Sequence, residues 1–345
     1  MVTATSRTPR ILCFGELLLR LSPPDDWLEQ QSMNVFVGGA ELNVATALAH
    51  WGLPSAYCTA LPDNYLSQQI IHSLNQKNVD TSRIKFSGER IGTYYLPQGK
   101  DLKNAGVIYD RAYSSFWNLK PGDINWKELL KGITWFHCSA ITPALNANVA
   151  ALLLEAVKEA QRQNITVSID LNYRNKLWQW GVQPAEVMKE IVAHCDVVMG
   201  NLWAVENLLG ISSSIKESKG KSDEELIAAA GTSMLQLHKT YPSVQTMAYT
   251  FRLSDRYFAV LQHGPQQCIS QQFKLHSIID GVGSGDAFMA RLIYGLHQQL
   301  PAQTTIDFAA ASAVSKLSIK GDATTATISD IQKLISQHAA TIPNS

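Results

Sequence analysis

The sequence predicts an α/β fold, with a mainly parallel sheet between helices and a small β-sheet outside it. Strand-like apolar runs alternate with amphipathic helical segments along most of the chain, which is typical of a parallel sheet. The alternation breaks over 84–118, where two tyrosine-rich runs predict a hairpin. A length of 345 residues suits one large domain with a small addition. We therefore expect one domain over 10–340, with the small sheet formed from about 16–37 and 86–118.

The composition indicates a well-packed enzyme without a polyanionic partner. Hydrophobic residues make up 46% of the chain, and 29 lysines and arginines balance 29 aspartates and glutamates. This balance argues against binding of nucleic acid or an anionic membrane, and no apolar run approaches the length of a membrane span. The first ten residues show no apolar leader, and the cysteines form no short pairs, so we expect reduced thiols in a cytoplasmic protein. The cysteines are Cys13, Cys58, Cys138, Cys195 and Cys268.

In the first half of the chain, glycine and proline punctuate short periodic segments. The expected order is a buried strand at 11–15 that continues to 21, a helix from about 43 to 51, a strand at 56–60 and a helix at 65–77. Gly92–Leu96 and Val107–Arg111 then form the hairpin, around a polar turn at 98–105. Tyr109 and Arg111 are alternate residues and share one strand face, so they are placed to form a polar lid over a ligand. The residues by themselves favour the alternative, a half-exposed edge sheet without a ligand.

From Gly132 onward the alternation of strands and helices returns. Strands are expected at 133–138, 165–170, 196–200, 244–251 and 257–261, followed by a strand-like run at 273–279. Helices are expected at 148–162, 184–194, 202–209, 223–240, about 305–319 and about 329–338. The strand at 165–170 leads into Asp170, Asn172 and Arg174. Because ligands in such folds bind beyond the carboxyl ends of the strands, these residues are well placed for a site.

The glycine-rich stretch Asp280–Phe288 carries the functional prediction. Three glycines fall at a turn that opens an apolar helix, where backbone amides lack intrahelical acceptors and the helix dipole adds positive potential. Glycine lets an anion come close to this backbone. Asp286 would repel a phosphate unless it has its own task, and a base beside a phosphate site is what phosphoryl transfer to a hydroxyl requires. A structural turn is the alternative, while a dinucleotide-binding fingerprint fits the spacing poorly.

Three features, in this order and spacing, resemble the ribokinase-like (PfkB) carbohydrate kinase family. They are the double glycine with its asparagine in Gly38–Asn43, the β insertion, and Gly283–Asp286. The resemblance runs from about residue 11 to about 338 and implies a ribokinase-like three-layer α/β/α sandwich with the small sheet as a lid. Within the family, the chain looks most like kinases of 2-keto-3-deoxygluconate. That likeness is carried by Gly15–Leu18, Val37–Ala45, Gly92–Tyr94, Tyr109–Arg111, Ile141–Leu145, Asp170–Arg174 and Leu177–Trp178.

The resemblance implies an ATP- and Mg²⁺-dependent kinase that phosphorylates the terminal C6 hydroxyl of this sugar acid. Asp286 would be the general base, and the amides of Gly283, Ser284 and Gly285 would form the anion hole for the transferring phosphate. Arginine suits a sugar acid because its planar fork of donors matches a carboxylate. The implied substrate-binding residues are Gly38, Gly39, Asn43, Tyr94, Tyr109, Arg111, Asn172 and Arg174. The implied ATP-binding residues are Asn201, Thr250, Arg252, Gly283 and Gly285.

The metal side departs from the family pattern. The family usually carries Asn-x-x-Glu after the strand at 196–200, with the glutamate helping to organise Mg²⁺. Here Asn201 is followed at the fourth position by Ala204. Glu206 and Asp170 are then the acids left to consider for the metal.

The nucleotide side departs as well. Gly281 stands where the family usually has threonine, and the loop from Thr250 to Arg256 contains no glycine. Arg252 is therefore considered in place of a backbone contact to phosphate, with a solvated arginine as the alternative. Lys316–Asp322, ending in Lys320-Gly321-Asp322, resembles the family's closing segment beside the adenine.

Two other functions stay open. One is a kinase for a neutral sugar such as fructose, or for another keto-deoxy acid, which Arg111 and Arg174 would discriminate. The other is a sugar-binding regulatory protein with weak phosphotransfer. The resemblance also implies a homodimer or higher assembly through the lid, and it leaves a monovalent cation open as a further cofactor.

Overall fold

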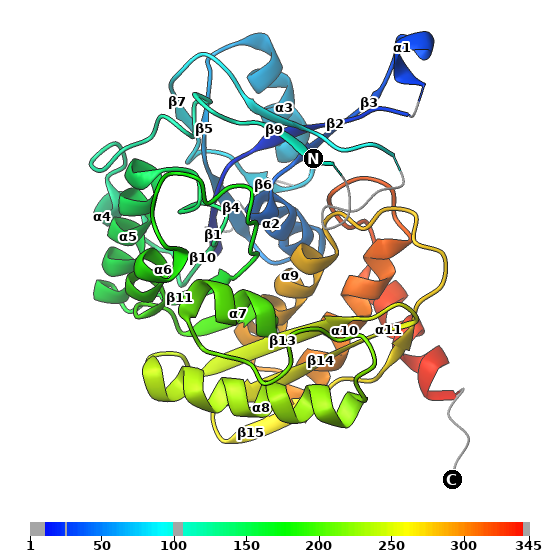
Figure 1. Ribbon diagram of the computed structural model, residues 1–345. Helices are drawn as coiled ribbons and strands as arrows, with labels where there is room; N and C mark the ends of the chain where they lie inside the picture. The colour runs from blue at the N-terminus through cyan, green and yellow to red at the C-terminus, as the bar shows by residue number, and fades with distance from the viewer. Residues whose placement is uncertain (1–10, 25, 99–105, 341–345) are drawn as a thin grey trace, which may run out of the picture.

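Within the computed structural model, which describes residues 11–24, 26–98 and 106–340, a ten-stranded sheet carries helices on both faces (Figure 1). Its strands are β1 (Ile11–Phe14), β4 (Ser55–Cys58), β6 (Val79–Asp80), β10 (Trp135–Ser139), β11 (Thr166–Asp170), β12 (Val197–Gly200), β13 (Thr246–Arg252), β14 (Arg256–His263), β15 (Gln266–Ile269) and β16 (Phe273–Lys274). The order is β15-β14-β13-β12-β11-β10-β1-β4-β6, with β16 beside β14. From β13 to β6 all neighbours are parallel, and β14 is antiparallel to β13, β15 and β16. The predicted α/β class is confirmed.

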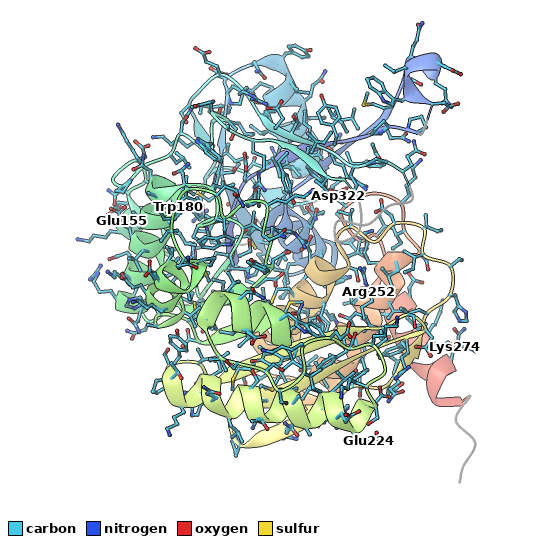
Figure 2. The ribbon with its side chains drawn as sticks, in the orientation of Figure 1. Glu155, Trp180, Glu224, Arg252, Lys274 and Asp322 are labelled. Atoms are coloured by element: carbon cyan, nitrogen blue, oxygen red, sulfur yellow. The ribbon has the colours of Figure 1, made fainter. Side chains whose placement is uncertain are left out.

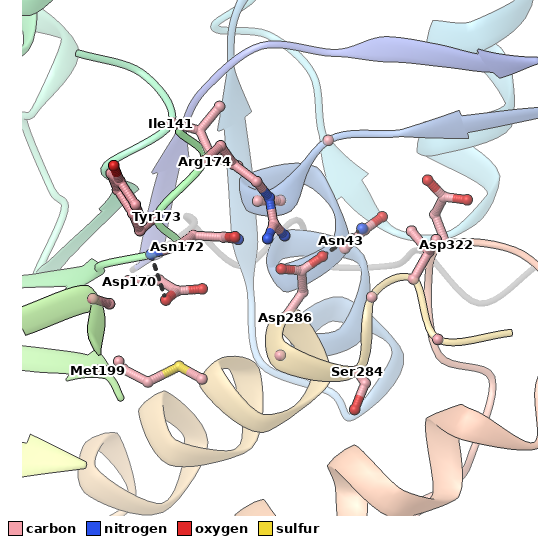
Figure 3. Close-up of a pocket in the computed structure, with 18 of the residues that line it drawn as sticks. Asn43, Ile141, Asp170, Asn172, Tyr173, Arg174, Met199, Ser284, Asp286 and Asp322 are labelled. Carbon is pink, nitrogen blue, oxygen red and sulfur yellow. Dashed lines mark hydrogen bonds between the residues drawn. The ribbon is translucent and has the colours of Figure 1, made fainter. Parts of the chain in front are cut away.

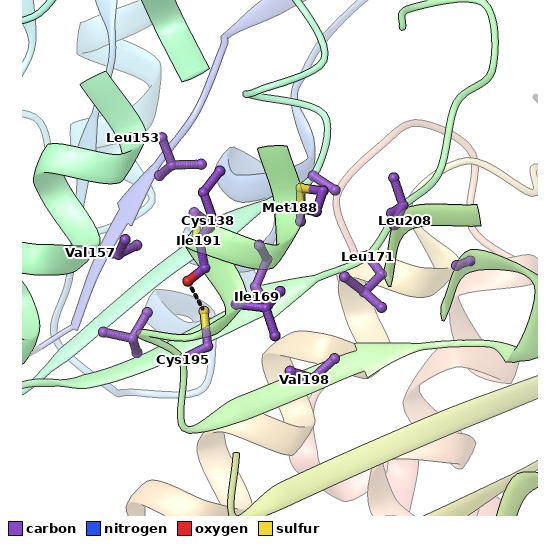
Figure 4. Close-up of a cluster of buried hydrophobic side chains, with 14 of the residues drawn as sticks. Cys138, Leu153, Val157, Ile169, Leu171, Met188, Ile191, Cys195, Val198 and Leu208 are labelled. Atoms are coloured by element: carbon purple, nitrogen blue, oxygen red, sulfur yellow. Dashed lines mark hydrogen bonds between the residues drawn. The ribbon is translucent and has the colours of Figure 1, made fainter. Parts of the chain in front are cut away.

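Each parallel strand is apolar on both sides because both faces of the sheet are covered. In β1, Leu12 and Phe14 belong to one core, and Ile11 and Cys13 belong to the other. The first core packs under α5 (Ala147–Arg162), α6 (Pro184–Val192), α7 (Leu202–Leu209) and α8 (Asp223–Thr240), and part of it is shown in Figure 4. The second packs under α2 (Ala40–His50), α3 (Tyr65–Gln76), α9 (Ser284–His297), α10 (Ala302–Leu317) and α11 (Ile328–Ala340).

A separate four-stranded sheet, here called the lid sheet, extends from the main body with α1 (Trp27–Gln30) at its tip (Figure 1). Its strands are β2 (Leu18–Ser22), β3 (Asn34–Gly38), β8 (Gly92–Tyr95) and β9 (Ile108–Asp110), in the order β3-β2-β8-β9. The antiparallel pairing of β8 with β9 confirms the predicted hairpin, while most of its polar turn, at 98–105, lies outside the described residues. The small remaining elements are β5 (Ala60–Leu61), β7 (Lys85–Phe86) and α4 (Trp126–Leu129).

Two strand predictions were wrong in extent, and the strands β6, β7 and β15 were not predicted. The strand predicted to run from 11 to 21 is divided into β1 and β2, which lie in different sheets. The strand-like run at 273–279 forms a strand only at Phe273–Lys274. Farther on, the N–H of Ile279 donates to the carbonyl of Leu317 at the end of α10, and the Ile279 side chain is 55% exposed. The polar strand β15 escaped prediction because its glutamines give no apolar alternation. The domain limits of 10–340 stay a prediction.

The predicted state of the cysteines is confirmed. All five are buried and free of disulfides. In the part of the chain that the structure describes, no helix has the length and apolar content needed to cross a bilayer.

Candidate active site

A cavity of about 350 Å³ opens where the carboxyl ends of the parallel strands face the lid sheet. Its wall combines the ends of β11, β12 and β13, the starts of α2 and α9, and the inner face of the lid sheet. All but two of the predicted site residues line it. The exceptions are Gly38, which lies just before the lining residue Gly39, and Glu206.

The start of α9, Gly283–Asp286, is the helix N-terminus at which the sequence predicts an anion-binding site, and it is called the cradle below. Gly283 has a φ of 80° and caps the helix, and Ala287 is the first residue whose N–H bonds back, to the carbonyl of Gly283 at 2.9 Å. The three amides between them therefore lack intrahelical acceptors. The hydroxyl of Ser284 donates to the carbonyl of Ala313 at 3.0 Å, so only its amide is left for an anion. A Cβ on Gly283 would lie 1.8 Å from the carbonyl oxygen of Asp322, which excludes any side chain there.

Asp286 lies in the first turn of α9, on the cavity wall, and is 7% exposed (Figure 3). The side-chain amide of Asn43, in the first turn of α2, donates to its Oδ2 at 2.7 Å. Burial raises the pKa of Asp286 to about 8, and the charges of Asp170 and Glu41 act in the same direction. The hydrogen bond from Asn43 opposes this shift. The carboxyl is therefore able to accept a proton near neutral pH.

The end of β11 supplies an acid and an arginine. Asp170 accepts a hydrogen bond from the N–H of Asn172 at 3.1 Å, and burial raises its pKa to about 7. Arg174 reaches across the cavity toward Asp286 (Figure 3). Among the described residues its guanidinium has no hydrogen-bond or ion-pair partner. The sequence placed Asp170 and Arg174 at the end of one strand, and in the structure both line the cavity that Asp286 also lines.

Arg111, the other predicted carboxylate ligand, already holds a carboxylate of the protein. Its Nε donates to Glu16 Oε2 at 2.7 Å, and its Nη2 lies 2.6 Å from the same oxygen. The hydroxyl of Ser114 donates to the second Glu16 oxygen at 2.6 Å. Arg111 and Glu16 are both nearly inaccessible, at 4% and 3%. The resemblance implied a site role for Arg111 and none for Glu16, which it includes only within Gly15–Leu18.

On the nucleotide side the predicted residues make weaker or structural contacts. Asn201 caps α7, because its Oδ1 accepts the N–H of Ala204 at 2.9 Å. The hydroxyl of Thr250 donates to the carbonyl of Gly200 at 3.4 Å. Arg252 lies at the end of β13, half-buried (Figure 2).

The two candidate metal ligands, Glu206 and Asp170, differ in their position relative to the cavity. Glu206 pairs with Lys216 and does not line the cavity, which argues against its predicted metal role. Asp170 does line it. Within the described ranges no group of three or more histidine, cysteine, aspartate or glutamate side chains is arranged for a metal.

Three charged residues that are not among the predicted site residues by role lie beside the cradle under the lid sheet: Arg20, which the sequence did not single out, and Asp280 and Asp322, which fall within segments that it did. Asp322, whose segment was expected near the adenine, accepts a hydrogen bond from the hydroxyl of Tyr94 at 3.2 Å. Its Oδ2 also lies 2.1 Å from where a Cβ on Gly38 would be, which explains this glycine. A lone arginine in the otherwise apolar strand β2 was the available sequence signal.

The comparisons with known proteins agree with this architecture. The family described as pfkB family carbohydrate kinase matches residues 8–328. A 2-dehydro-3-deoxygalactonokinase of Haloferax volcanii is 27% identical over 334 residues, covering 95% of this chain and 97% of that protein. The crystal structure of 2-dehydro-3-deoxygluconokinase from Thermotoga maritima has a TM-score of 0.85 and 34% identity, covering 95% of this chain and 100% of that one. A PfkB family carbohydrate kinase from Listeria grayi has a TM-score of 0.81 and 29% identity, covering 95% and 99%.

The chain therefore belongs to the pfkB family of carbohydrate kinases. The predicted ribokinase-like three-layer fold with a small separate sheet is confirmed.

Proposed function

We propose that this sugar kinase transfers the γ-phosphate of ATP to the terminal C6 hydroxyl of a 2-keto-3-deoxy sugar acid, with 2-keto-3-deoxygluconate as the leading substrate. The observation that carries the proposal is Arg174, whose guanidinium makes no hydrogen bond or ion pair with the described residues and points across the cavity toward Asp286. It interacts with Asp170 and Asp286 only through longer-range charge attraction. A neutral sugar leaves its donors without a charged acceptor, whereas a sugar carboxylate pairs with them through charge-assisted hydrogen bonds. The names of the Thermotoga and Haloferax relatives support the same substrate class and differ in the epimer.

In the proposed mechanism Asp286 is the general base. The C6 oxygen forms a bond to the γ-phosphorus while Asp286 takes the hydroxyl proton, and the bond from the γ-phosphorus to the bridging oxygen breaks. That oxygen leaves with the electron pair on ADP. The amides of Gly283, Ser284 and Gly285 would stabilise the charge on the phosphoryl oxygens. Asn43 holds the base in position through its 2.7 Å hydrogen bond.

Mg²⁺ fits the site through Asp170. This ion keeps several waters and needs only one or two carboxylates besides the phosphates of the nucleotide. Asp170 lines the cavity, and its carboxylate is held by the N–H of Asn172, which donates to Oδ1 at 3.1 Å. Bound there, Mg²⁺ would neutralise phosphate charge. Asn201, Thr250 and Arg252 would contact the nucleotide, while Tyr94, Tyr109 and Asn172 would contact the sugar acid.

The lid sheet supports the proposal of a homodimer. Its outer face exposes 53% of Val35, 39% of Val37 and 62% of Ile108, beside the charged pair Arg90–Asp110 at one edge. Burying such a face against a second copy is favourable, and it also protects the edge strands. Light scattering should give twice the monomer mass, and Val35→Lys with Ile108→Lys should give a monomer. A monomeric wild type would contradict the dimer. The cytoplasmic location stays a prediction, which cell fractionation checks.

A coupled ADP-release assay tests the function. The panel should hold 2-keto-3-deoxygluconate, its galactonate epimer, fructose and ribose. We expect the acids to exceed the neutral sugars in kcat/KM by about 10²-fold, because a neutral sugar cannot form the charge-assisted hydrogen bonds to Arg174. Equal rates for fructose would overturn the substrate class. Sugar binding without ADP release would support the regulatory alternative instead.

One observation favours a neutral-sugar kinase. Arg111 is paired with Glu16, so Arg174 alone is left for a substrate carboxylate, where two arginines were expected. The same panel discriminates the two functions. NMR of the product, with phosphorus coupled to the C6 protons, would establish the position of transfer.

A further inference from the structure

A buried cluster of charges joins the lid sheet to the cradle, and the proposed mechanism does not use it. Arg20 on β2 donates to both oxygens of Asp280, at 3.3 and 2.6 Å, just before the cradle. Its Nε lies 2.8 Å from Oδ1 of Asp322, in the loop after α10. The side chain of Arg20 is 3% exposed, that of Asp280 9% and that of Asp322 1%. One guanidinium therefore balances two carboxylates that water barely reaches.

Asp280 and Asp322 also accept hydrogen bonds, the first from backbone amides and the second from a side chain of the lid sheet. Asp280 accepts the N–H of Val282 in the cradle loop at 3.1 Å and the N–H of Gly321 in the neighbouring loop at 3.0 Å. Asp322 accepts the hydroxyl of Tyr94 on β8. The guanidinium stacks 4.3 Å from the ring of Phe36 on β3. Arg20 thus connects three lid strands to the two loops that shape the phosphate cradle.

We propose that Arg20 is the built-in cation of the phosphate cradle. It positions the cradle loop relative to the lid sheet, and it occupies the carboxylates at which a monovalent cation would otherwise bind. Arg20 is a positioning residue, since it acts through Asp280 and Asp322. The kinetic part of this inference rests on the proposed function, because turnover is its measure.

The electrostatics of the cluster favour this role. The only other cation facing it within the described residues is Lys316, which is fully buried and donates to the carbonyl of Ile319 at 2.9 Å. Tyr94 and Asp286 complete the titratable surroundings. With Arg20 removed, two buried carboxylates face one ammonium, and an unpaired buried carboxylate is strongly unfavourable. The site must then take a proton or a cation from solution.

The wild-type protein gives the first test, and it needs no variant. We expect turnover to be the same within about twofold in potassium, sodium or tetramethylammonium chloride at about 0.1 M ionic strength, where screening is equal. Activation by potassium of about tenfold or more over tetramethylammonium would overturn the proposal, because it would show an inorganic cation still required.

Thermal unfolding supplies a readout that does not depend on the substrate. A cation that binds only the folded state raises Tm. Potassium should therefore raise the Tm of Arg20→Ala by about 2 °C or more above tetramethylammonium, and leave wild type unchanged. A potassium-specific rise in wild type would overturn the proposal even if the substrate were wrongly assigned. Failure of every sugar in the panel, with this pattern intact, would instead overturn the proposed function.

Arg20→Ala completes the kinetic test. A displaced cradle should cost about 10²-fold in kcat, while the sugar acid Kd changes little. Methylguanidinium should restore about tenfold of the loss, because it refills the space with the missing charge. Arg291 is the matched control: it is equally buried, lies on the rings of Tyr294 and Phe308, and pairs with no carboxylate in the described chain. Arg291→Ala should show no rescue, and normal kcat in Arg20→Ala would contradict the positioning role.

Discussion

The two halves of the cavity, which we propose to bind the sugar and the nucleotide, are built differently. Under the lid sheet, buried ion pairs such as Arg111–Glu16 and Arg20–Asp280 hold the wall in one arrangement. At the other end, Asn201 uses its side chain for a helix cap, and Arg252 is half-buried. Buried ion pairs rigidify a site, whereas a half-buried charge has more freedom to adapt to a ligand. Selectivity should therefore reside on the lid side, and nucleotide affinity should tolerate change.

Asp286, at the junction of the two halves, should give the largest effect. Asp286→Asn removes the proton acceptor and keeps the shape, so kcat should fall by about 10²–10⁴-fold while the Kd of sugar and ATP stays within a few-fold. Single-turnover kinetics and calorimetric binding measure the two quantities. A near-normal kcat would remove Asp286 from its role.

Stability separates a catalytic loss from a folding loss in this variant. The pKa of Asp286 is raised from 3.8 to about 8, so the carboxyl stabilises the fold when protonated and loses that contribution as the pH rises through about 8. Asparagine stays neutral throughout. At pH 9 the variant should therefore be more stable than wild type, by about 1 kcal/mol or more in the free energy of unfolding.

The cradle offers a matched pair of glycines. Gly283→Ala should reduce kcat by about 10²-fold and destabilise the protein, because its φ of 80° and the carbonyl of Asp322 leave no room for a Cβ. At Gly285 the nearest atom to a new Cβ is 4.0 Å away, on Met199. Gly285→Ala should keep its stability and most of its rate. Equal losses in both would show that the cradle backbone is not the determinant.

Substitutions of Arg174 and Arg111 should have different effects: the first should weaken substrate binding, and the second should also destabilise the fold. Arg174→Gln should raise the KM of the sugar acid by about 10- to 100-fold and leave neutral sugars unchanged, because glutamine cannot pair its side chain with the carboxylate as an ion. Arg111→Gln leaves the buried carboxylate of Glu16 without its ion-pair partner. It should therefore also lower the free energy of unfolding, by about 3 kcal/mol. Steady-state kinetics and denaturant unfolding distinguish them. If Arg174→Gln weakened acid and neutral sugars equally, its carboxylate role would fail.

The pH dependence of kcat/KM tests whether the charges of Asp170 and Asp286 are coupled. Because the base must be ionised, kcat/KM should rise about tenfold per pH unit below the pKa of Asp286, about 8, and level off above it. Asp170 contributes to that raised pKa through its negative charge. Asp170→Asn should therefore move the midpoint to lower pH, whatever it does to the plateau. An unchanged midpoint would mean that the two carboxyls are not coupled.

The same residues show which parts of the fold and of the site can be predicted from the sequence alone. The parallel strands and their polar ends were predictable because periodicity and strand-end chemistry are local properties, as at Asp170–Arg174. The cradle was predictable because glycine spacing encodes a helix start. The pairings Glu16–Arg111 and Arg20–Asp280 were not, since they join residues 95 and 260 positions apart whose partners are chosen by packing of the lid sheet. The helix cap made by Asn201 was hidden for a similar reason, because capping and ligand binding favour the same residue type.

Arg252 should give the smallest effect, because it lies on the adaptable side. Arg252→Ala should raise the KM of ATP by about three- to tenfold, change kcat less than threefold, and leave the sugar KM and the Tm unaltered, as expected for a partly solvated charge near phosphate. Arg252→Lys keeps the charge and should recover most of the difference. Raising the ionic strength from about 0.05 to 0.5 M should shrink the gap between wild type and Arg252→Ala. A reduction of about 10²-fold, or a change in sugar KM, would show that the nucleotide half is as preorganised as the sugar half.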